Sequence, residues 1–209
     1  MMTSDFLIGY TGDQVVAQPS CQIGIAYNES ARPVEFKGKA TIRSNTVIYG
    51  DVFAGENFQT GHGVLVRENT RIGDHVVLGT NTVVDGNVQI GNFVKIESNC
   101  YICTHVSIGD RVFLGPNVVL TNDRIPLKQR AQYVPIGPTI ESGVTLGAGV
   151  ILLPGVTVGE DSFVAAGTIV TKDVPPKSFV IGSPGEIKPL PEALDERNMA
   201  LSWMKCLKS

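Results

Sequence analysis

The chain has 209 residues, of which 43% are apolar and 18% are charged, and its formal net charge is −3. This balance argues against a nucleic-acid-binding protein, which would carry a basic excess or a basic stripe. No apolar run is long enough to span a membrane, the N-terminus lacks the layout of a signal peptide, and the 4 cysteines are too few for a disulfide framework. We therefore expect a cytoplasmic protein that binds neither nucleic acid nor a membrane.

Residues 1–35 are out of phase with the rest of the chain, and we expect an irregular N-terminal segment there. From residue 36 onwards aliphatic residues recur every six positions. The repeat reads Ile42, Ile48, Ala54, Thr60, Val66, Ile72, Leu78, Val84, Ile90, Ile96, Ile102, Ile108, Leu114 and Leu120. After an interruption, it resumes at Ile140, Leu146, Leu152, Val158, Val164 and Val170.

A short strand and a tight turn repeated every six residues are typical of a parallel β-helix, and of neither an α-helix nor an alternating strand. Three such segments form one triangular coil of 18 residues, and successive coils stack about 4.8 Å apart. Each buried Val, Leu or Ile then contributes roughly 1.5–3 kcal/mol of transfer free energy. Gly, Asn and Asp at the corners accept a positive φ. The sequence thus predicts an all-β prism.

These hexapeptides resemble the repeats of the left-handed β-helix acyltransferase family over about residues 36–185, which would form the catalytic domain. The resemblance implies left-handed winding, a homotrimer, and acetyl-CoA bound as co-substrate in the groove between two prisms. Residues 186–209 form a tail in which Leu194, Met199 and Trp203 recur near helical spacing. We expect a short C-terminal helix there.

The repeat breaks at the segment TNDRIP, residues 121–126, and residues 123–139 are expected to leave the prism as a protruding loop. Long loops in a fold of minimal turns are usually functional. A spacing of 18 residues places Thr104 beneath Asn122 and His105 beneath Asp123 on one edge. The loop also carries the basic residues Arg124, Lys128 and Arg130. The plainer alternative is that Asn and Asp only start the loop and the basic residues form a solvated face.

The second block, residues 146–176, resembles the coenzyme-binding coils of family acetyltransferases. By motif position, the resemblance implies that Ala148 and Ala166 let the pantetheine arm approach the backbone, and that Thr171 and Lys172 contact the coenzyme. IGSPGEIK, residues 181–188, resembles the family's closing segment and leaves Lys188 as a further candidate for the phosphates. Alternatively, Gly and Ala here merely form corners.

The segment TNDRIP also resembles a motif of acetyltransferases that act on amino groups of nucleotide-linked sugars. Family O-acetyltransferases carry a catalytic His where this chain has Ile125. A hydroxyl needs such a base, whereas an amine with a pKa near 8 is partly neutral already. We therefore expect an N-acetyltransferase in which Asn122 or a backbone N–H stabilises the thioester oxygen, Asp123 holds the amine and His105 takes the surplus proton.

Arg124, Thr104 and His62 are the expected substrate-binding residues, with His62 contributed by a neighbouring subunit. The plainer interpretation of His62 is a corner residue bonded to the backbone. His62, His75 and His105 fall at three different phases of the repeat, so we expect no metal site. Cys100 and Cys103 form a single CxxC that we interpret as structural.

Two alternative functions remain. An O-acetyltransferase would use His105 or His62 as its base, and a comparison of amino and hydroxy acceptors would distinguish it. A non-catalytic β-helix scaffold would fail to bind CoA.

Overall fold

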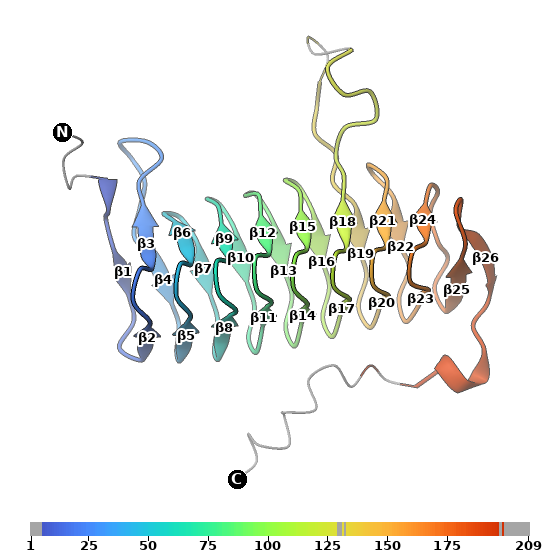
Figure 1. Cartoon of the computed structure of the whole chain (residues 1–209), viewed down its shortest axis with the longest axis horizontal. Helices are drawn as coiled ribbons and strands as arrows, with labels where there is room; N and C mark the ends of the chain where they lie inside the picture. The colour runs from blue at the N-terminus through green and yellow to red at the C-terminus, as the bar shows by residue number, and fades with distance from the viewer. Residues whose placement is uncertain (1–5, 129–130, 132, 197, 199–209) are drawn as a thin grey trace.

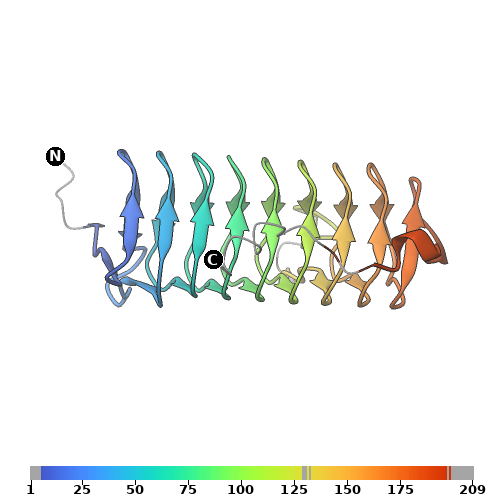
Figure 2. The same ribbon diagram turned by 90° about the horizontal axis from the view of Figure 1, so that it is seen from below.

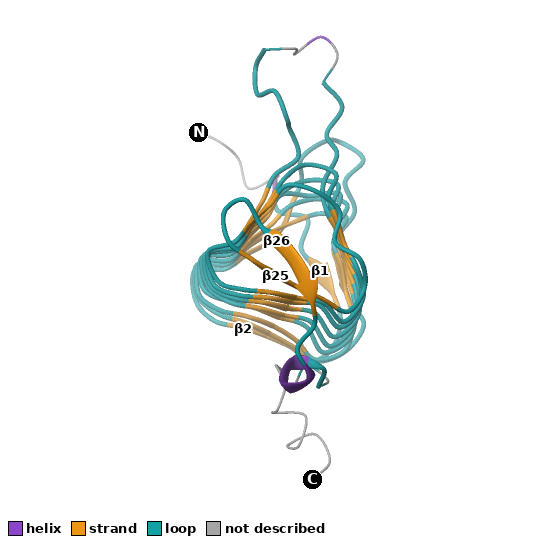
Figure 3. Ribbon diagram, turned by 90° about the vertical axis from the view of Figure 1, so that its right-hand side faces the viewer, coloured by secondary structure: helices purple, strands orange, loops and turns teal. Residues whose placement is uncertain are grey.

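The chain forms an elongated triangular prism of parallel strands (Figures 1 and 2). The structure is a computed structural model that describes residues 6–128, 131, 133–196 and 198. Its three sheets are the three sides of the prism, and seen from one end they enclose a triangle (Figure 3). The predicted all-β coil of hexapeptides is confirmed.

Each sheet is named here after its first strand. The β1 sheet contains β1 (Tyr10–Thr11), β4 (Val34–Phe36), β7 (Phe53–Ala54), β10 (Arg71–Ile72), β13 (Gln89–Ile90), β16 (Ser107–Ile108), β19 (Thr139–Ile140) and β22 (Thr157–Val158). The β2 sheet contains β2 (Val15–Ala17), β5 (Ala40–Ile42), β8 (Phe58–Thr60), β11 (Val77–Leu78), β14 (Lys95–Ile96), β17 (Phe113–Leu114), β20 (Thr145–Leu146), β23 (Phe163–Val164), β25 (Ser178–Ile181) and β26 (Glu186–Pro189). The β3 sheet contains β3 (Gln22–Ile25), β6 (Val47–Tyr49), β9 (Leu65–Val66), β12 (Val83–Val84), β15 (Tyr101–Ile102), β18 (Val119–Leu120), β21 (Ile151–Leu152) and β24 (Ile169–Val170).

The chain visits the three sheets in turn, so the prism has three kinds of corner. The corner where the chain passes from the β3 sheet to the β1 sheet is called the loop corner. The corner from the β2 sheet to the β3 sheet is called the alanine corner, because it holds Ala148 and Ala166. Neighbouring coils are in an 18-residue register, as Val83 opposite Tyr101 shows.

Side chains alternate between an outer and a buried position in the repeat strands, which explains the six-residue repeat. In the two-residue strands from β7 to β24 the second residue points inward and is buried, as Leu78 and Ile96 are, while the first is half-buried or exposed. The predicted aliphatic positions form one continuous core that includes Ala54 and the buried Thr60.

The corners use backbone conformations that ordinary side chains avoid. Asn81, Asn99 and Asn117 stack in successive coils of the alanine corner with φ of 57°, 61° and 60°. Left-handed φ costs an L-residue roughly 1–2 kcal/mol, and Asn and Gly tolerate it best. This requirement explains why Asn and Gly punctuate the repeats.

The N-terminal segment differs from the expected irregular structure, because β1, β2 and β3 already form a coil of the prism. Val15 pairs with Ala40, a spacing of 25 residues, so this coil is longer than the regular 18-residue coils and out of the six-residue phase. An isolated antiparallel bridge joins Leu7 to Ile25 at the first coil, while the strand β26 runs antiparallel to β25 at the other end. Such antiparallel pairings shield sheet edges that would otherwise be free to pair.

The C-terminal tail contains a single 3₁₀ turn at Glu192–Leu194 in its described part. Residues 199–209, on which the predicted helix depends, lie outside the described residues. In the part of the chain that the structure describes, no helix is long and apolar enough to cross a membrane.

We expect the corner conformation to set the response to substitution at Asn117, which is exposed. Asn117→Gly should leave the free energy of unfolding within about 0.5 kcal/mol of wild type. Asn117→Val should lower it by about 1–2 kcal/mol, because a β-branched residue resists positive φ. Urea denaturation followed by circular dichroism measures both, and equal stability of the two variants would contradict the corner argument.

Candidate active site

The repeats are interrupted once within the described residues, between β18 and β19, where the chain leaves the loop corner and returns (Figure 1). Asn122 is the last residue that keeps the 18-residue register, and its side-chain amide donates to the backbone oxygen of Thr104 at 3.5 Å. The returning chain closes the neck of the loop, since the Ile136 amide donates to the Asn122 oxygen at 3.1 Å. The Gly155 amide of the next coil then donates to Ile136 at 3.0 Å.

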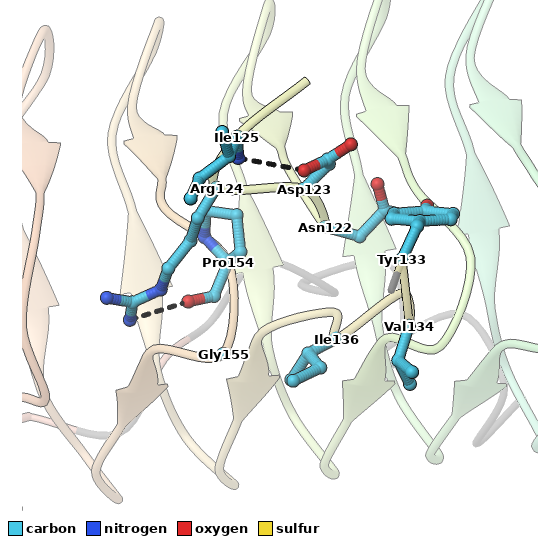
Figure 4. Close-up of a pocket in the computed structure, with 9 residues that line it drawn as sticks. All are labelled: Asn122, Asp123, Arg124, Ile125, Tyr133, Val134, Ile136, Pro154 and Gly155. Atoms are coloured by element: carbon cyan, nitrogen blue, oxygen red, sulfur yellow. Dashed lines mark hydrogen bonds between the residues drawn. The ribbon is translucent and has the colours of Figure 1, made fainter. Parts of the chain in front are cut away.

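A pocket of about 460 Å³ lies between this loop and the next coil. It is lined by Asn122, Asp123, Arg124, Ile125, Tyr133, Val134, Ile136, Pro154 and Gly155. Figure 4 shows Arg124 and Pro154 on one side and Tyr133 and Val134 on the other, with Asn122 and Asp123 between them. The structure therefore brings the predicted amide, carboxylate and guanidinium groups into one pocket.

Two hydrogen bonds hold the polar side chains of the pocket. The Asp123 carboxylate accepts a hydrogen bond from the Ile125 amide at 2.8 Å, through its Oδ1 atom. Arg124 donates through Nη2 to the Pro154 oxygen at 3.0 Å, which ties the outgoing limb of the loop to the neighbouring corner. Both groups can act on a ligand from these positions, because a carboxylate has two acceptor oxygens and a guanidinium has five donors.

His105 does not line this pocket, and the prediction that it stacks beneath Asp123 is wrong. The residue stacked over His105 is Gly137, because Ser107 pairs with Thr139 across the loop, a spacing of 32 residues instead of 18. The loop departs between Asn122 and Asp123, so the arithmetic that holds for Thr104 fails one residue later. The exposed His105 imidazole instead lies 2.9 Å from the Thr104 hydroxyl through Nδ1.

Tyr133 is a pocket residue that the six-residue pattern does not identify, because it lies in the loop, where the pattern carries no information. Burial raises the pKa of its phenol above the ordinary value of 10, and the charge of Asp123 raises it further. The phenol is therefore protonated at neutral pH. Lys128 in the same loop is exposed and does not line the pocket, and Arg130 lies outside the described residues.

The residues expected to contact a coenzyme lie at several places on the prism. Ala148 and Ala166 are exposed and stack in successive coils of the alanine corner, where a Cβ on Gly147 would lie 2.5 Å from the Ala166 nitrogen. The two coils therefore pack closely at this corner, and its exposed side chains are small. Thr171 and Lys172 are exposed at the loop corner, and Lys188 on β26 lies 3.6 Å from Glu186.

Within one chain, the alanine corner lies where the strands of the β3 sheet begin, and the pocket lies where they end. Ala148 precedes β21, whereas Pro154 and Gly155 follow it. The structure thus separates the expected acetyl donor site from the expected acceptor site by the width of that sheet.

The three histidines lie at three different corners. His62 is exposed at the alanine corner, 3.3 Å from the Ser44 hydroxyl, and His75 stacks on Phe93 at 4.9 Å between ring centroids. Among the described residues, no cluster of His, Cys, Asp and Glu could hold a metal ion. Burial raises the pKa of the Cys100 thiol to about 11 and that of Cys103 to about 12, so neither forms a thiolate near neutral pH.

Two models of known protein families match the repeats of this chain. The model described as bacterial transferase hexapeptide (six repeats) matches residues 87–122 and 137–172, and its two matches flank the loop. A second model, the hexapeptide repeat of succinyl-transferase, matches residues 69–103. Residues 87–122 and 137–172 are thus similar to the repeats of bacterial hexapeptide transferases. The winding of this hexapeptide-repeat chain matches the left-handed β-helix of that class, as predicted.

Individual proteins similar to this hexapeptide-repeat chain agree with the family match. Galactoside O-acetyltransferase of Lactococcus lactis is 42% identical over 84 residues, which cover 38% of this chain and 40% of that protein. Galactoside O-acetyltransferase of Escherichia coli is 38% identical over 79 residues, covering 36% and 39%. The chain thus spans about 40% of the length of these curated relatives.

Among solved structures, the Francisella novicida UDP-N-acetylglucosamine acyltransferase shares the fold. Its TM-score is 0.58 at 19% identity, and the alignment covers 90% of this chain and 70% of that one.

The position of Gly137 over His105 is testable. A Cβ on Gly137 would lie 2.5 Å from the His105 carbonyl, so Gly137→Ala should lower the free energy of unfolding by about 1–3 kcal/mol. Gly149→Ala is the matched control, because a Cβ there meets open space and only its φ of 66° opposes the change. Denaturation midpoints compare the two. A smaller loss at Gly137 than at Gly149 would contradict the stacking.

Proposed function

We propose that this protein is a cytoplasmic acetyltransferase that transfers the acetyl group of acetyl-CoA to the amine of an amino sugar, in its nucleotide-linked form. The observation that carries the proposal is the pocket in which Asn122 and Asp123 meet, at the single described break in a series of transferase repeats. A scaffold would have no need for a polar pocket at that break. The family match and the galactoside O-acetyltransferase relatives support acetyl transfer.

The proposed reaction uses few protein groups. Asp123 holds the ammonium form of the acceptor, and loss of one proton to water makes it a nucleophile. The amine nitrogen attacks the thioester carbonyl, the C–S bond breaks, and the second amine proton leaves with the thiolate as CoA thiol. The Asn122 amide donates to the carbonyl oxygen as that oxygen gains charge. His105, one coil away, receives the first proton through water.

The nature of the acceptor distinguishes two candidate functions. Pocket position 125 holds Ile, which cannot deprotonate a hydroxyl, and this favours an amine that needs positioning more than a base. O-acetylation of a sugar hydroxyl is the second candidate, because the two galactoside relatives carry that activity in their names. In that case His105 or His62 would have to act as the base.

A homotrimer is part of the proposal. The outer positions of the β3 sheet form an apolar stripe of stacked residues, namely Val47, Leu65, Val83, Tyr101, Val119, Ile151 and Ile169. The same positions in the β1 sheet include the polar residues Glu35, Arg71, Gln89 and Ser107. Burial of the apolar stripe against another copy would bring the alanine corner of one subunit near the pocket of the next, and so join the donor and acceptor sites.

We expect Asn122→Ala to lower kcat/KM for acetyl transfer about a hundredfold, since the proposed donor to the developing oxyanion is lost. Asp123→Asn should cause a similar loss with an amine acceptor, and His105→Ala a smaller one. Thiol release from acetyl-CoA, with an amino sugar and the matching hydroxy sugar as parallel acceptors, measures all three. Leu127→Ala, in the same loop but outside the pocket lining, is the control.

Near-normal turnover in both the Asn122 and Asp123 variants would reject the assignment of these two residues. Faster transfer to the hydroxy sugar would favour the second candidate instead.

Substitutions that place charged residues in the apolar stripe test the proposed trimer. Leu65→Glu with Val83→Glu should shift the protein towards the monomer, because burying these unpaired like charges at the interface is unfavourable. Gln59→Glu with Val77→Glu places the same charges on the β2 sheet of the same coils and should leave the oligomer intact. Light scattering after size-exclusion chromatography gives the mass. Dissociation by the control pair alone would place the interface on the other sheet.

A further inference from the structure

Tyr133 forms the wall of the pocket nearest the proposed reaction centre. It lies on the returning limb of the loop, and Figure 4 places its ring beside Asn122 and Asp123, across the pocket from Arg124. Its side chain is 45% exposed, so the ring is open to a ligand. The aromatic surface is therefore available next to the carboxylate that would hold an amine.

Both apolar and polar groups surround the Tyr133 ring, and this combination suits a carbohydrate. Val134 and Ile136 extend the apolar wall beside Tyr133, and Ile125 and Pro154 also line the pocket. The polar groups of Asn122 and Asp123 interrupt this surface. A sugar ring presents C–H groups on its faces and polar groups at its rim, so one face can stack on an aromatic ring while the rim makes hydrogen bonds.

The phenol itself is suited to binding and not to proton transfer. Burial and the neighbouring charge of Asp123 raise its pKa, so the hydroxyl stays protonated at neutral pH and can donate a hydrogen bond. A protonated phenol with a raised pKa is a poor general base.

We infer that Tyr133 is the residue that selects a ring-shaped acceptor, by stacking on the face of the sugar whose amine is held by Asp123. A sugar ring is favoured over a nucleotide base, because Tyr133 lies beside the amine-holding carboxylate, where the reacting ring must sit. The inference rests on the proposed function and names the substrate feature that the pocket recognises.

Steady-state kinetics provide the first test. Tyr133→Ala should raise KM for an amino-sugar acceptor about five- to tenfold, with KM for acetyl-CoA unchanged, because stacking contributes binding that is present before the chemical step. Tyr133→Phe, which keeps the ring, should stay within about threefold of wild type. Leu127→Ala, exposed on the same loop, should behave as wild type.

If amino-sugar acetylation proceeds in wild type but Tyr133→Ala leaves the acceptor KM unchanged, the inference fails while the proposed function stands. An equal loss in Tyr133→Phe and Tyr133→Ala would also overturn stacking, because the hydroxyl and not the ring would then be responsible.

Ligand binding without turnover provides the second test. The chain has 5 tyrosines, so ¹⁹F NMR of protein labelled with 3-fluorotyrosine should give five resonances, and Tyr133→Phe identifies the one from Tyr133. Glucosamine should shift that resonance, and the acyclic amine 2-amino-1,3-propanediol should shift it much less at equal concentration. Equal shifts with the two amines, or a shift with uridine diphosphate but not with glucosamine, would overturn the inference. This readout holds even if no acetyl transfer is detected.

Discussion

The structure depends on the stacking of one coil on the next through backbone hydrogen bonds. Amides such as that of Val83 donate to the coil above, here to the Cys100 oxygen at 2.9 Å, and this pattern recurs along all three sides. Two requirements follow from that stacking. Aliphatic side chains must fill the interior in register, and each corner must turn within about four residues. The corner requirement explains why left-handed φ values recur at stacked positions, including His105 and Arg111.

The same stacking makes any insertion conspicuous, because extra residues can only leave the prism at a corner. The loop after β18 leaves in this way, and the coils on either side of it still pair in register. Ser107 pairs with Thr139, and Val119 pairs with Ile151. A regular column of coils thus positions the loop. This division of roles is common where binding residues lie on loops held by a stable scaffold.

The loop corner is also polar in the coils that precede the loop, where ion pairs and a hydrogen bond join its charged residues. Arg67 contacts Glu68 at 2.8 Å and Asp85 at 3.3 Å, and Asp85 accepts a hydrogen bond from the Tyr101 hydroxyl at 3.0 Å. Burial, followed by the Asp85 contact, raises the Tyr101 pKa to about 12. These paired groups define a fixed polar edge beneath the loop and beside the apolar stripe of the β3 sheet.

The sequence by itself determined the prism, its inward aliphatic positions, its corner residues and the place of the break, because each depends on a local six-residue period that repeats without change. The sequence also correctly predicted that Asn122 stacks over Thr104, because the 18-residue register holds up to Asn122. Only the tertiary structure decided that Gly137 covers His105, that Tyr133 lines the same pocket as Asp123, and that residues 10–25 form a coil. In each of these cases the number of residues in a coil departs from 18, and a periodic pattern cannot report where a chain of irregular length returns.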